Sequence, residues 1–449
     1  MSETRVRAIV VHVELKRRGG NSQAPRASLR SPEARLEEAR SLALAVGLEV
    51  TEAFTATLAD PNPRTLLGSG KVHAITELVE RSDAELVIVD GQLSPVQQRN
   101  LEKAWKAKVL DRTGLILEIF GERAQTREGS LQVELAHLQY QKSRLVRSWT
   151  HLERQRGGFG FLGGPGESQL EIDRRLIQQR IGRIEGELET VKRTRSLHRQ
   201  SRARVPYPVV ALVGYTNAGK STLFNRLTNS GVLAKDMVFA TLDPTMREVT
   251  LPQGRKIILS DTVGFISDLP TMLVAAFRAT LEEVLSADLI LHVRDISHED
   301  SEAQAGDVES VLAELGLDEL RRRHVLEVWN KIDLVDEEER RQALASLSRR
   351  RDNVVLISSV TGEGLDTLLN HIDRRLAAAS VMFEIELGSE QGQELNWLYS
   401  RGEILSRHDD EHGLVRLRVR FDPAVAPLAR ARLGDRLKTI GDVLRPAAE

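Results

Sequence analysis

The segment from residue 209 to residue 221 constrains the fold more than any other part of the sequence. It reads VVALVGYTNAGKS, an apolar run that leads into Gly214-x-x-x-x-Gly219-Lys220-Ser221, and STLFNRLT continues from its last residue. The apolar run predicts a buried strand and the continuation predicts a helix. A glycine-rich turn between them lets backbone N–H groups wrap phosphates, while the lysine reaches the β and γ oxygens and the serine hydroxyl ligates magnesium. The segment therefore predicts a P-loop in a parallel α/β fold.

Two further segments follow in the order expected of a GTP-binding domain. In FATLDPT, Thr241 lies where a mobile loop could bring its hydroxyl to magnesium and the γ-phosphate, and Thr245 is the alternative. The strand KIILS leads to Asp261, which would act on magnesium through water, and to Gly264, whose amide would face the γ-phosphate. The predicted magnesium residues are therefore Ser221, Thr241 and Asp261.

The guanine base has its own predicted segment, because VLEVWNKID ends in Asn330-Lys331-x-Asp333. A carboxylate at Asp333 accepts the two adjacent N–H donors of guanine, which adenine lacks, so GTP is the expected substrate. LISSVTGEG supplies the loop behind the base. The predicted nucleotide contacts are Gly214, Tyr215, Thr216, Asn217, Ala218, Gly219, Lys220, Ser221, Phe239, Ala240, Thr241, Leu242, Asp243, Asp261, Thr262, Val263, Gly264, Asn330, Lys331, Ile332, Asp333, Ser358, Ser359 and Val360.

Phe265 follows Gly264 at the place where many GTPases carry a glutamine that aligns the attacking water. A phenylalanine cannot orient water, so no certain catalytic residue is predicted, and unassisted turnover should be at or below roughly 10⁻⁴ per second. The GTP state would then persist until a partner completes the site. The alternative is that Phe265 only packs the switch segment, and both can hold at once.

Composition excludes several classes of protein. The chain of 449 residues has no cysteine, which excludes disulfides, thiolate zinc sites and prenyl or palmitoyl anchors. Its N-terminus lacks the apolar segment of a signal peptide, and no run approaches the roughly eighteen apolar residues of a membrane span. We expect a cytoplasmic protein. HDDEH, residues 408–412, could be read as metal ligands, but a polar turn between two strands is the preferred interpretation.

Residues 1–126 alternate strand and helix signals, which predicts a small α/β domain with a parallel sheet. Ser31 is the expected N-cap of a helix that ends before Gly47. LLGSGK, residues 66–71, could seat a phosphate before a helix, although a glycine turn with a solvated lysine is preferred. From residue 127 a heptad spacing of apolar residues appears twice and predicts an antiparallel helical hairpin over 127–200. Residues 201–207 are expected to be a linker, 208–378 a GTPase domain and 379–449 an α+β domain.

The predicted hairpin is basic and has a glycine-rich tip. Residues 141–204 contain fifteen Lys and Arg against seven Asp and Glu, and GGFGFLGGPG occupies 157–166. In the C-terminal domain, the apolar residues of 415–421 alternate with Arg416, Arg418 and Arg420, which predicts a strand with a basic face, as suited to solvent as to RNA.

These motifs resemble the HflX family of the translation-factor-related GTPases. GYTNAGKS, FATLDPT and DTVGF match that family's nucleotide loops, and GPGESQLEIDRR, residues 164–175, resembles its hallmark before the GTPase domain. The resemblance covers essentially the whole chain. Ser168 stands where threonine is commoner and Ser359 where alanine is more usual.

The resemblance implies a GTPase that uses magnesium, binds the large ribosomal subunit near the peptidyl-transferase centre and splits ribosomes. A monomer is expected. Backbone at a thin glycine tip can approach RNA closely, exposed phenylalanines can stack on bases and arginines can meet phosphates. The expected RNA contacts are Arg154, Arg156, Gly157, Gly158, Phe159, Gly160, Phe161, Gly164, Gly166, Arg174 and Arg175. In related GTPases without the glutamine, an asparagine at the position of Asn217 ligates potassium; the alternative is that Asn217 only tolerates the turn.

Other functions remain as alternatives. The hairpin could be an intramolecular strut. A ribosome-assembly GTPase with a KH module is disfavoured, because the C-terminal part has no Gly-x-x-Gly between helices. A tRNA-modifying GTPase of the same superfamily is disfavoured because it needs a C-terminal cysteine. A protein-only signalling GTPase would need no basic hairpin, and an ATP-driven RNA remodeller would depend on GSGK alone.

Overall fold

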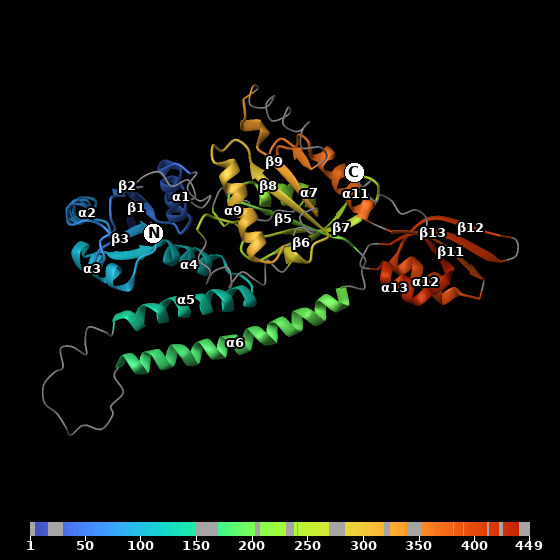
Figure 1. Ribbon diagram of the computed structural model, residues 1–449, viewed down its shortest axis with the longest axis horizontal. Coiled ribbons are helices and arrows are strands. Elements are labelled where there is room, and N and C mark those ends of the chain that lie inside the picture. The colour runs from blue at the N-terminus through green and yellow to red at the C-terminus, as the bar shows by residue number, and fades with distance from the viewer. Residues whose placement is uncertain are drawn as a thin grey trace, which may run out of the picture.

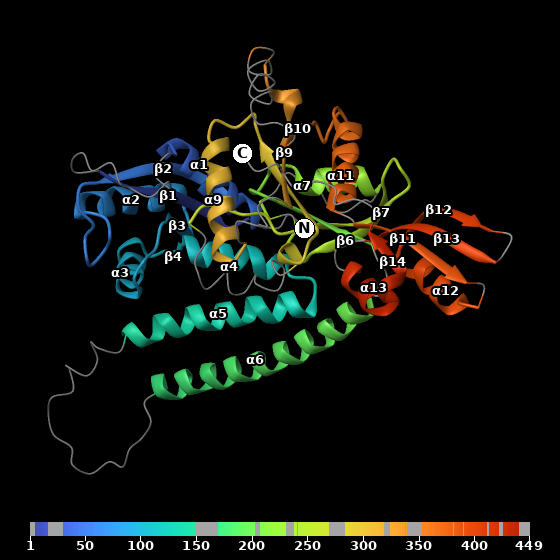
Figure 2. The same cartoon turned by 45° about the vertical axis from the view of Figure 1, so that its right-hand side comes forward.

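The computed structural model describes most of the chain in three sheets and their helices. The described residues are 5–16, 30–148, 169–202, 207–229, 238–239, 241–268, 283–317, 324–336, 338, 353–379, 381–388, 390–410, 413–421 and 425–439. Figures 1 and 2 place the N-terminal sheet and the C-terminal sheet on opposite sides of the central one, with two long helices running below.

The N-terminal sheet is parallel throughout, with the strand order β2-β1-β3-β4. Its elements are β1 (Arg7–Leu15), α1 (Pro32–Ala45), β2 (Glu49–Leu58), α2 (Ser69–Ser82), β3 (Leu86–Asp90), α3 (Pro95–Trp105), β4 (Lys108–Asp111) and α4 (Arg112–Arg123). The predicted cap of α1 is confirmed, because Ser31 accepts a hydrogen bond from the backbone N–H of Ala34 and Gly47 follows the helix with φ +71°. Lys71 donates to the carbonyl of Thr57, which supports a structural reading of the GSGK turn.

Helices α5 (Arg127–Ser148) and α6 (Gln169–Arg202) lie side by side in both views. Lys142 contacts Gln178 and Arg127 contacts Glu187, so the two helices run in opposite directions. Leu131, Ile184 and Leu188 form the buried apolar seam between them. Residues 201 and 202, assigned to a linker from the sequence, are helical, and the segment that joins α5 to α6 lies outside the described residues.

The central sheet has the order β10-β9-β8-β5-β7-β6, in which only β6 is antiparallel to its neighbour. Its elements are β5 (Val209–Gly214), α7 (Lys220–Thr228), β6 (Thr245–Thr250), β7 (Lys256–Asp261), β8 (Leu289–Asp295), α9 (Ser301–Glu314), β9 (Val325–Asn330), η5 (Ile332–Leu334), β10 (Val354–Leu356) and α11 (Leu365–Ala379). The strand and helix predicted on either side of the P-loop are therefore present. The carboxyl ends of β5, β7 and β9 meet at one edge, where ligands of open α/β sheets bind.

The C-terminal sheet is antiparallel, with the order β12-β13-β11-β14. Its elements are β11 (Val381–Gly388), α12 (Gly392–Arg401), β12 (Glu403–Asp409), β13 (Leu414–Phe421), α13 (Ala426–Leu433), η6 (Gly434–Arg436) and β14 (Leu437–Thr439). The turn expected from residue 408 begins two residues later, because β12 continues through Asp409 and Gly413 donates to the carbonyl of Asp410. Among the described residues, no cluster of metal-ligating side chains is found. Arg416 pairs with Glu386 at 2.9 Å on the basic face.

One hydrophobic cluster runs from the N-terminal sheet into the central sheet. It joins residues of α4 and α5 to apolar residues that flank the P-loop and Asp261, and Phe120 meets Phe239 edge to face with ring centroids 4.7 Å apart. The members from the central domain include Val213, Tyr215, Val238, Phe239, Leu242, Val263, Phe265 and Ile266. Within the described part of the chain, no helix is long and apolar enough to cross a membrane.

The seam between α5 and α6 leads to a stability prediction. Ile184 is 0% exposed, so Ile184→Ala leaves a cavity and should lower the free energy of unfolding by about 2–5 kcal/mol, measured by urea titration. Leu176 on the same helix is 55% exposed, so Leu176→Ala should change it by less than about 0.5 kcal/mol. Equal effects of the two substitutions would contradict the packing described here.

Candidate functional site

The P-loop depends on two glycines that no other residue could replace without movement. Gly214 has φ +152°, and a Cβ there would lie 2.1 Å from the carbonyl oxygen of Val293. Gly219 has φ +93°, and a Cβ there would lie 2.2 Å from Asn330 Nδ2. Lys220 Nζ donates to the carbonyls of Gly214 and Tyr215 at 3.0 and 2.7 Å, which fixes the loop around its side chain. The loop can thus wrap a phosphate with its backbone N–H groups.

Three oxygen-bearing side chains converge beside Lys220. Ser221 Oγ donates to Asp261 Oδ2 at 2.7 Å, and Thr241 Oγ1 donates to the same oxygen at 2.8 Å and lies 2.9 Å from Ser221 Oγ. Of the two threonines considered from the sequence, Thr241 is the one whose hydroxyl contacts Asp261, while Thr245 begins strand β6. Asp261 Oδ1 is buried and has no hydrogen-bond partner within the described part of the chain. These residues fit magnesium, which prefers oxygen ligands and often binds carboxylates through water.

Burial shifts the charges at this end of the site. It lowers the pKa of Lys220 to about 8, against the opposing effect of Asp261, and it raises the pKa of Asp261. A phosphate near the lysine favours its charged form and a cation near the carboxylate favours the ionised form. Both groups therefore suit a ligand that carries anionic phosphates and a divalent cation.

The other end of the site holds the predicted base-binding residues. Asn330 donates from Nδ2 to the carbonyl of Ala218 at 2.8 Å and accepts from the backbone N–H of Ser359 at 2.9 Å, so it joins the P-loop to the loop of residues 357–364. Lys331 pairs with Asp295 at 2.7 Å. Leu334 and Val360 line this end and are 66% and 67% exposed, so their apolar side chains are suited to contact with a flat base.

A cavity of about 470 Å³ connects the two ends. It brings together most of the side chains predicted to contact nucleotide, and it is lined by Thr216, Asn217, Gly219, Lys220, Ser221, Thr222, Phe239, Thr241, Thr262, Gly264, Asn330, Lys331, Asp333, Leu334, Ser359 and Val360. Ala240 lies outside the described residues. The cavity lining does not include the predicted contacts Gly214, Tyr215, Ala218, Leu242, Asp243, Asp261, Val263, Ile332 and Ser358. Of these, Tyr215 directs its hydroxyl to the N-terminal domain, and Asp243 accepts hydrogen bonds at the start of α5.

Phe265 is 2% exposed and pairs with the P-loop as a short parallel bridge to Tyr215. Its N–H donates to the carbonyl of Gly214 at 3.1 Å, and its carbonyl accepts from the N–H of Thr216 at 2.7 Å. The side chain belongs to the cluster shared with the N-terminal domain. The packing interpretation is supported, and a side chain so buried still cannot orient water.

Asn217 has φ +60° and is exposed at the cavity. Asparagine tolerates this left-handed conformation better than most residues, which supports its role in the turn. That role does not use the side-chain oxygen, so the predicted potassium contact remains a prediction. Of the predicted RNA contacts, Arg174 and Arg175 are exposed on α6, and the others lie outside the described residues.

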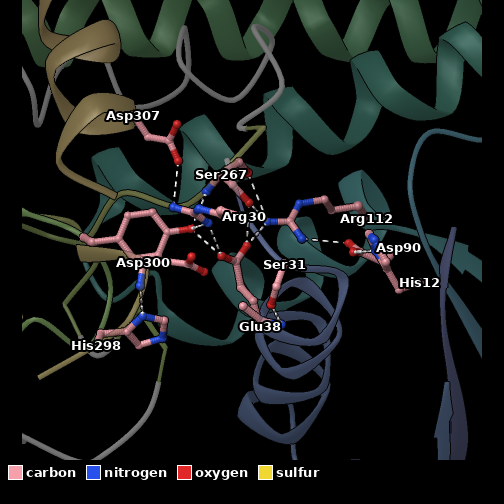
Figure 3. Close-up of polar contacts among 12 residues, drawn as sticks. His12, Arg30, Ser31, Glu38, Asp90, Arg112, Ser267, His298, Asp300 and Asp307 are labelled. Carbon is pink, nitrogen blue, oxygen red and sulfur yellow. Dashed lines mark hydrogen bonds and ion pairs between the residues drawn. The ribbon is translucent and has the colours of Figure 1, made fainter. Parts of the chain in front are cut away.

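A buried polar cluster links the N-terminal domain to the P-loop and the segment after Phe265, and it was not predicted. The Tyr215 hydroxyl donates to Glu38. It accepts from the N–H of Ser267 and from Arg30, both at 2.7 Å. Arg112 donates to the carbonyl of Ser267 at 3.0 Å and pairs with Glu38. Figure 3 shows Arg30, Glu38, Arg112 and Ser267 turned toward one another.

The same cluster continues into the N-terminal sheet. Arg112 pairs with Asp90 at 2.7 Å, and His12 Nδ1 lies 2.7 Å from the other carboxylate oxygen of Asp90. Burial acts to raise the pKa of Glu38, but Arg112, the Tyr215 hydroxyl and Arg30 outweigh it and hold the pKa below its ordinary value. A sequence signal for Glu38 existed: it lies four residues before Leu42 and seven before Ala45, on the buried face of α1.

Four protein-family models match the chain. They are described as GTP-binding GTPase N-terminal over residues 33–121, GTP-binding GTPase Middle Region over 123–202, 50S ribosome-binding GTPase over 209–331 and HflX C-terminal domain over 343–442. Together they cover the two long helices and the three sheets except for strand β1.

Curated relatives match over most of their length. A protein named GTPase HflX from Magnetococcus marinus is 48% identical over 414 residues, which cover 92% of this chain and 92% of the relative. GTPase HflX from Escherichia coli is 44% identical and covers 86% and 89%. A crystal structure of a GTP-binding protein from Sulfolobus solfataricus with GDP is 24% identical, covers 82% of this chain and 98% of that chain, and has a TM-score of 0.44, too low to add to the comparison by sequence.

The buried cluster leads to a prediction on stability and pH. Arg112→Met leaves Glu38 and Asp90 buried with one cation fewer, so the free energy of unfolding near pH 7 should fall by about 3–5 kcal/mol, measured by urea titration. Because the pKa values of Glu38 and Asp90 are depressed in the folded protein, the stability that ionisation contributes is lost as the pH falls through them. The difference between variant and wild type should therefore shrink in acid.

The control is Arg40→Met on the same helix as Glu38. Arg40 pairs with Glu37 at 3.4 Å on the exposed surface, so its loss should change the free energy of unfolding by no more than about 0.5 kcal/mol at any pH. A small, pH-independent effect of Arg112→Met would show that the cluster contributes little.

Proposed function

The chain belongs to the HflX family of GTPases, and from that premise we propose that it binds the large ribosomal subunit in its GTP state and splits ribosomes or keeps their subunits apart. The observation that carries the proposal is one chain's combination of a guanine-nucleotide site with an antiparallel helix pair. The sequence is basic over residues 141–204, and a glycine-rich segment joins the two helices. GTP hydrolysis would time release.

The nucleotide site is proposed to work as follows. Lys220 and the P-loop amides hold the β- and γ-phosphates, Gly264 offers its N–H to the γ-phosphate, and Asp333 accepts from the guanine edge. Ser221 and Thr241 would hold Mg²⁺ directly and Asp261 through water; the ion would neutralise phosphate charge there. Close packing supports the role of Gly264, because a Cβ at this residue would lie 2.8 Å from Thr216 Cγ2 and 3.1 Å from Lys220 Nζ.

Phe265 occupies the place where many GTPases carry a water-aligning glutamine, which supports slow turnover without a partner. Phe265 is held by two backbone hydrogen bonds and by burial, so rotation of its side chain cannot bring a polar group to the γ-phosphate. Completion of the site would have to come from outside it. In this proposal the large ribosomal subunit supplies it.

The RNA-binding part is proposed to be the hairpin over 127–200, with its tip at 157–166. The antiparallel pairing of α5 and α6 would hold the tip on a stiff base. Arg174 and Arg175 are exposed on α6, and their positive charge suits RNA phosphates. The domain limits stated from the sequence remain predictions.

Sedimentation of intact ribosomes tests the splitting function. With the protein and a non-hydrolysable GTP analogue, monosomes should separate into subunits, and the protein should migrate with the large one. Deletion of residues 157–166 should abolish separation while leaving nucleotide affinity within about twofold, because the P-loop lies in another domain. Intact monosomes with the protein left at the top of the gradient would exclude splitting.

The same experiment separates the alternatives. Binding to free large subunits or their precursors without splitting would favour an assembly role, and binding to neither would favour a protein-only partner.

Potassium dependence tests the role of Asn217. If the Asn217 carbonyl ligates potassium, GTP turnover should be several-fold faster in potassium than in sodium at equal ionic strength, and Asn217→Gly should remove the difference while preserving the left-handed turn. Gly is the suitable replacement because it adopts φ +60° without strain. Equal wild-type rates in the two salts would end the potassium proposal.

A further inference from the structure

The segment that carries Thr241 is attached to the first of the two long helices through Asp243. Asp243 Oδ2 accepts from the backbone N–H groups of Gln125 and Thr126 at 2.9 and 2.8 Å, and Oδ1 accepts from Thr126 Oγ1 at 2.5 Å. Thr126 in turn accepts from the N–H of Gly129 at 3.0 Å, as an N-cap does. A carboxylate from another domain therefore occupies the N-terminus of α5, where the helix dipole favours negative charge.

The attachment is short enough to transmit movement. Only Leu242, which is buried, separates Asp243 from Thr241, whose hydroxyl lies 2.8 Å from Asp261. On the other side of Thr241, Phe239 is anchored against Phe120 of α4. Thr241 is thus held between two contacts with the α4–α5 part of the molecule, one apolar and one charged.

We propose that Asp243 is a positioning residue that holds Thr241 toward the γ-phosphate end of the site and links the bound nucleotide to the position of α5. GTP favours the arrangement with Thr241 in the site, and the carboxylate carries that preference to the helix. GDP has no γ-phosphate for Thr241 to reach, so it gives no such preference. A partner that favours one position of α5 therefore changes the ratio of the affinities for GTP and GDP. By linkage, exchange of GDP for GTP changes the affinity for that partner by the same factor.

This inference rests on the proposed function in one respect. If α5 belongs to the ribosome-binding hairpin, binding of the large subunit reaches the nucleotide site through Asp243, and the subunit should raise the preference for GTP over GDP.

Two substitutions break the contact from opposite sides. Asp243→Ala removes the carboxylate. Gly129→Ala places a Cβ at 2.5 Å from Asp243 Oδ1, which displaces the carboxylate while giving α5 a better helix-forming residue. The second variant matters because a loss of function with a helix former at 129 cannot be ascribed to fraying of α5.

Matched controls are available for both. Glu248→Ala removes an exposed carboxylate from β6. This carboxylate pairs with the exposed Lys256 at 2.8 Å. Gly186→Ala adds the same methyl group to α6 at a position where a Cβ would meet nothing within 4 Å.

The first measurement is the ratio of affinities for a non-hydrolysable GTP analogue and GDP, without ribosomes. Asp243→Ala and Gly129→Ala should each lower the analogue's affinity by roughly tenfold relative to GDP, and the double variant should lose little more, because both break one contact. The controls should stay within about twofold. An unchanged ratio in both test variants overturns the proposal.

The second measurement is hydrogen exchange of the amides of Gln125 and Thr126. In the wild type, the analogue should protect these amides more than GDP does, and Asp243→Ala should remove that difference. Equal protection in the two nucleotide states overturns the proposal.

The third measurement adds large ribosomal subunits. They should raise the wild-type preference for the analogue by about fivefold or more, and Asp243→Ala should not show the increase. A variant that keeps the full increase overturns the link between subunit and nucleotide. A wild-type protein that binds no subunit refutes the proposed function, and the ratio and exchange measurements still decide the role of Asp243.

Discussion

Phe239 packs against Phe120 across the boundary between the nucleotide domain and the N-terminal domain, and the rest of the arrangement depends on that apolar contact. Phe239 takes an unfavourable φ of +57° to reach it, which for a bulky residue needs compensation from its surroundings. The compensation is burial among residues of both domains. The loops beside the phosphate end of the cavity are therefore shaped partly by a surface that does not touch nucleotide.

The polar part of the boundary has a different role. Burying Arg30, Glu38, Asp90 and Arg112 requires loss of their hydration, and pairing recovers that cost only when the geometry is met. Such clusters add little net free energy to the contact between two surfaces, but displacing one partner costs free energy because it leaves a buried charge unpaired. Here the partners include the hydroxyl of Tyr215 and the backbone of Ser267, so the penalty fixes the P-loop relative to the segment after Phe265.

The sequence could predict features that depend on residues close together in the chain, but not those that depend on distant ones. The P-loop, Asn330 and the cap at Ser31 were predictable because motif spacing or neighbouring residues determine them. The choice between Thr241 and Thr245 was not, since it depends on how the loop before β6 folds back onto Asp261. Strand β2 has no clear alternation, and α4 is buried on nearly every side, so neither shows a period. Tyr215 and Asp243 were assigned to the nucleotide by their motifs, yet their partners lie more than a hundred residues away.

The two loops at the phosphate end rest on one common support, and this limits how they can move. One loop leans on Phe120 and the start of α5, and the other is held by Arg112 at the start of α4. Helices α4 and α5 pack against each other within a shared apolar cluster, so a shift of one helix is expected to move the other. A conformer with one loop withdrawn and the other in place would have to separate α4 from α5 or leave a buried charge without its partner. The protein should therefore populate two main conformations, and conformations intermediate between them should be rare.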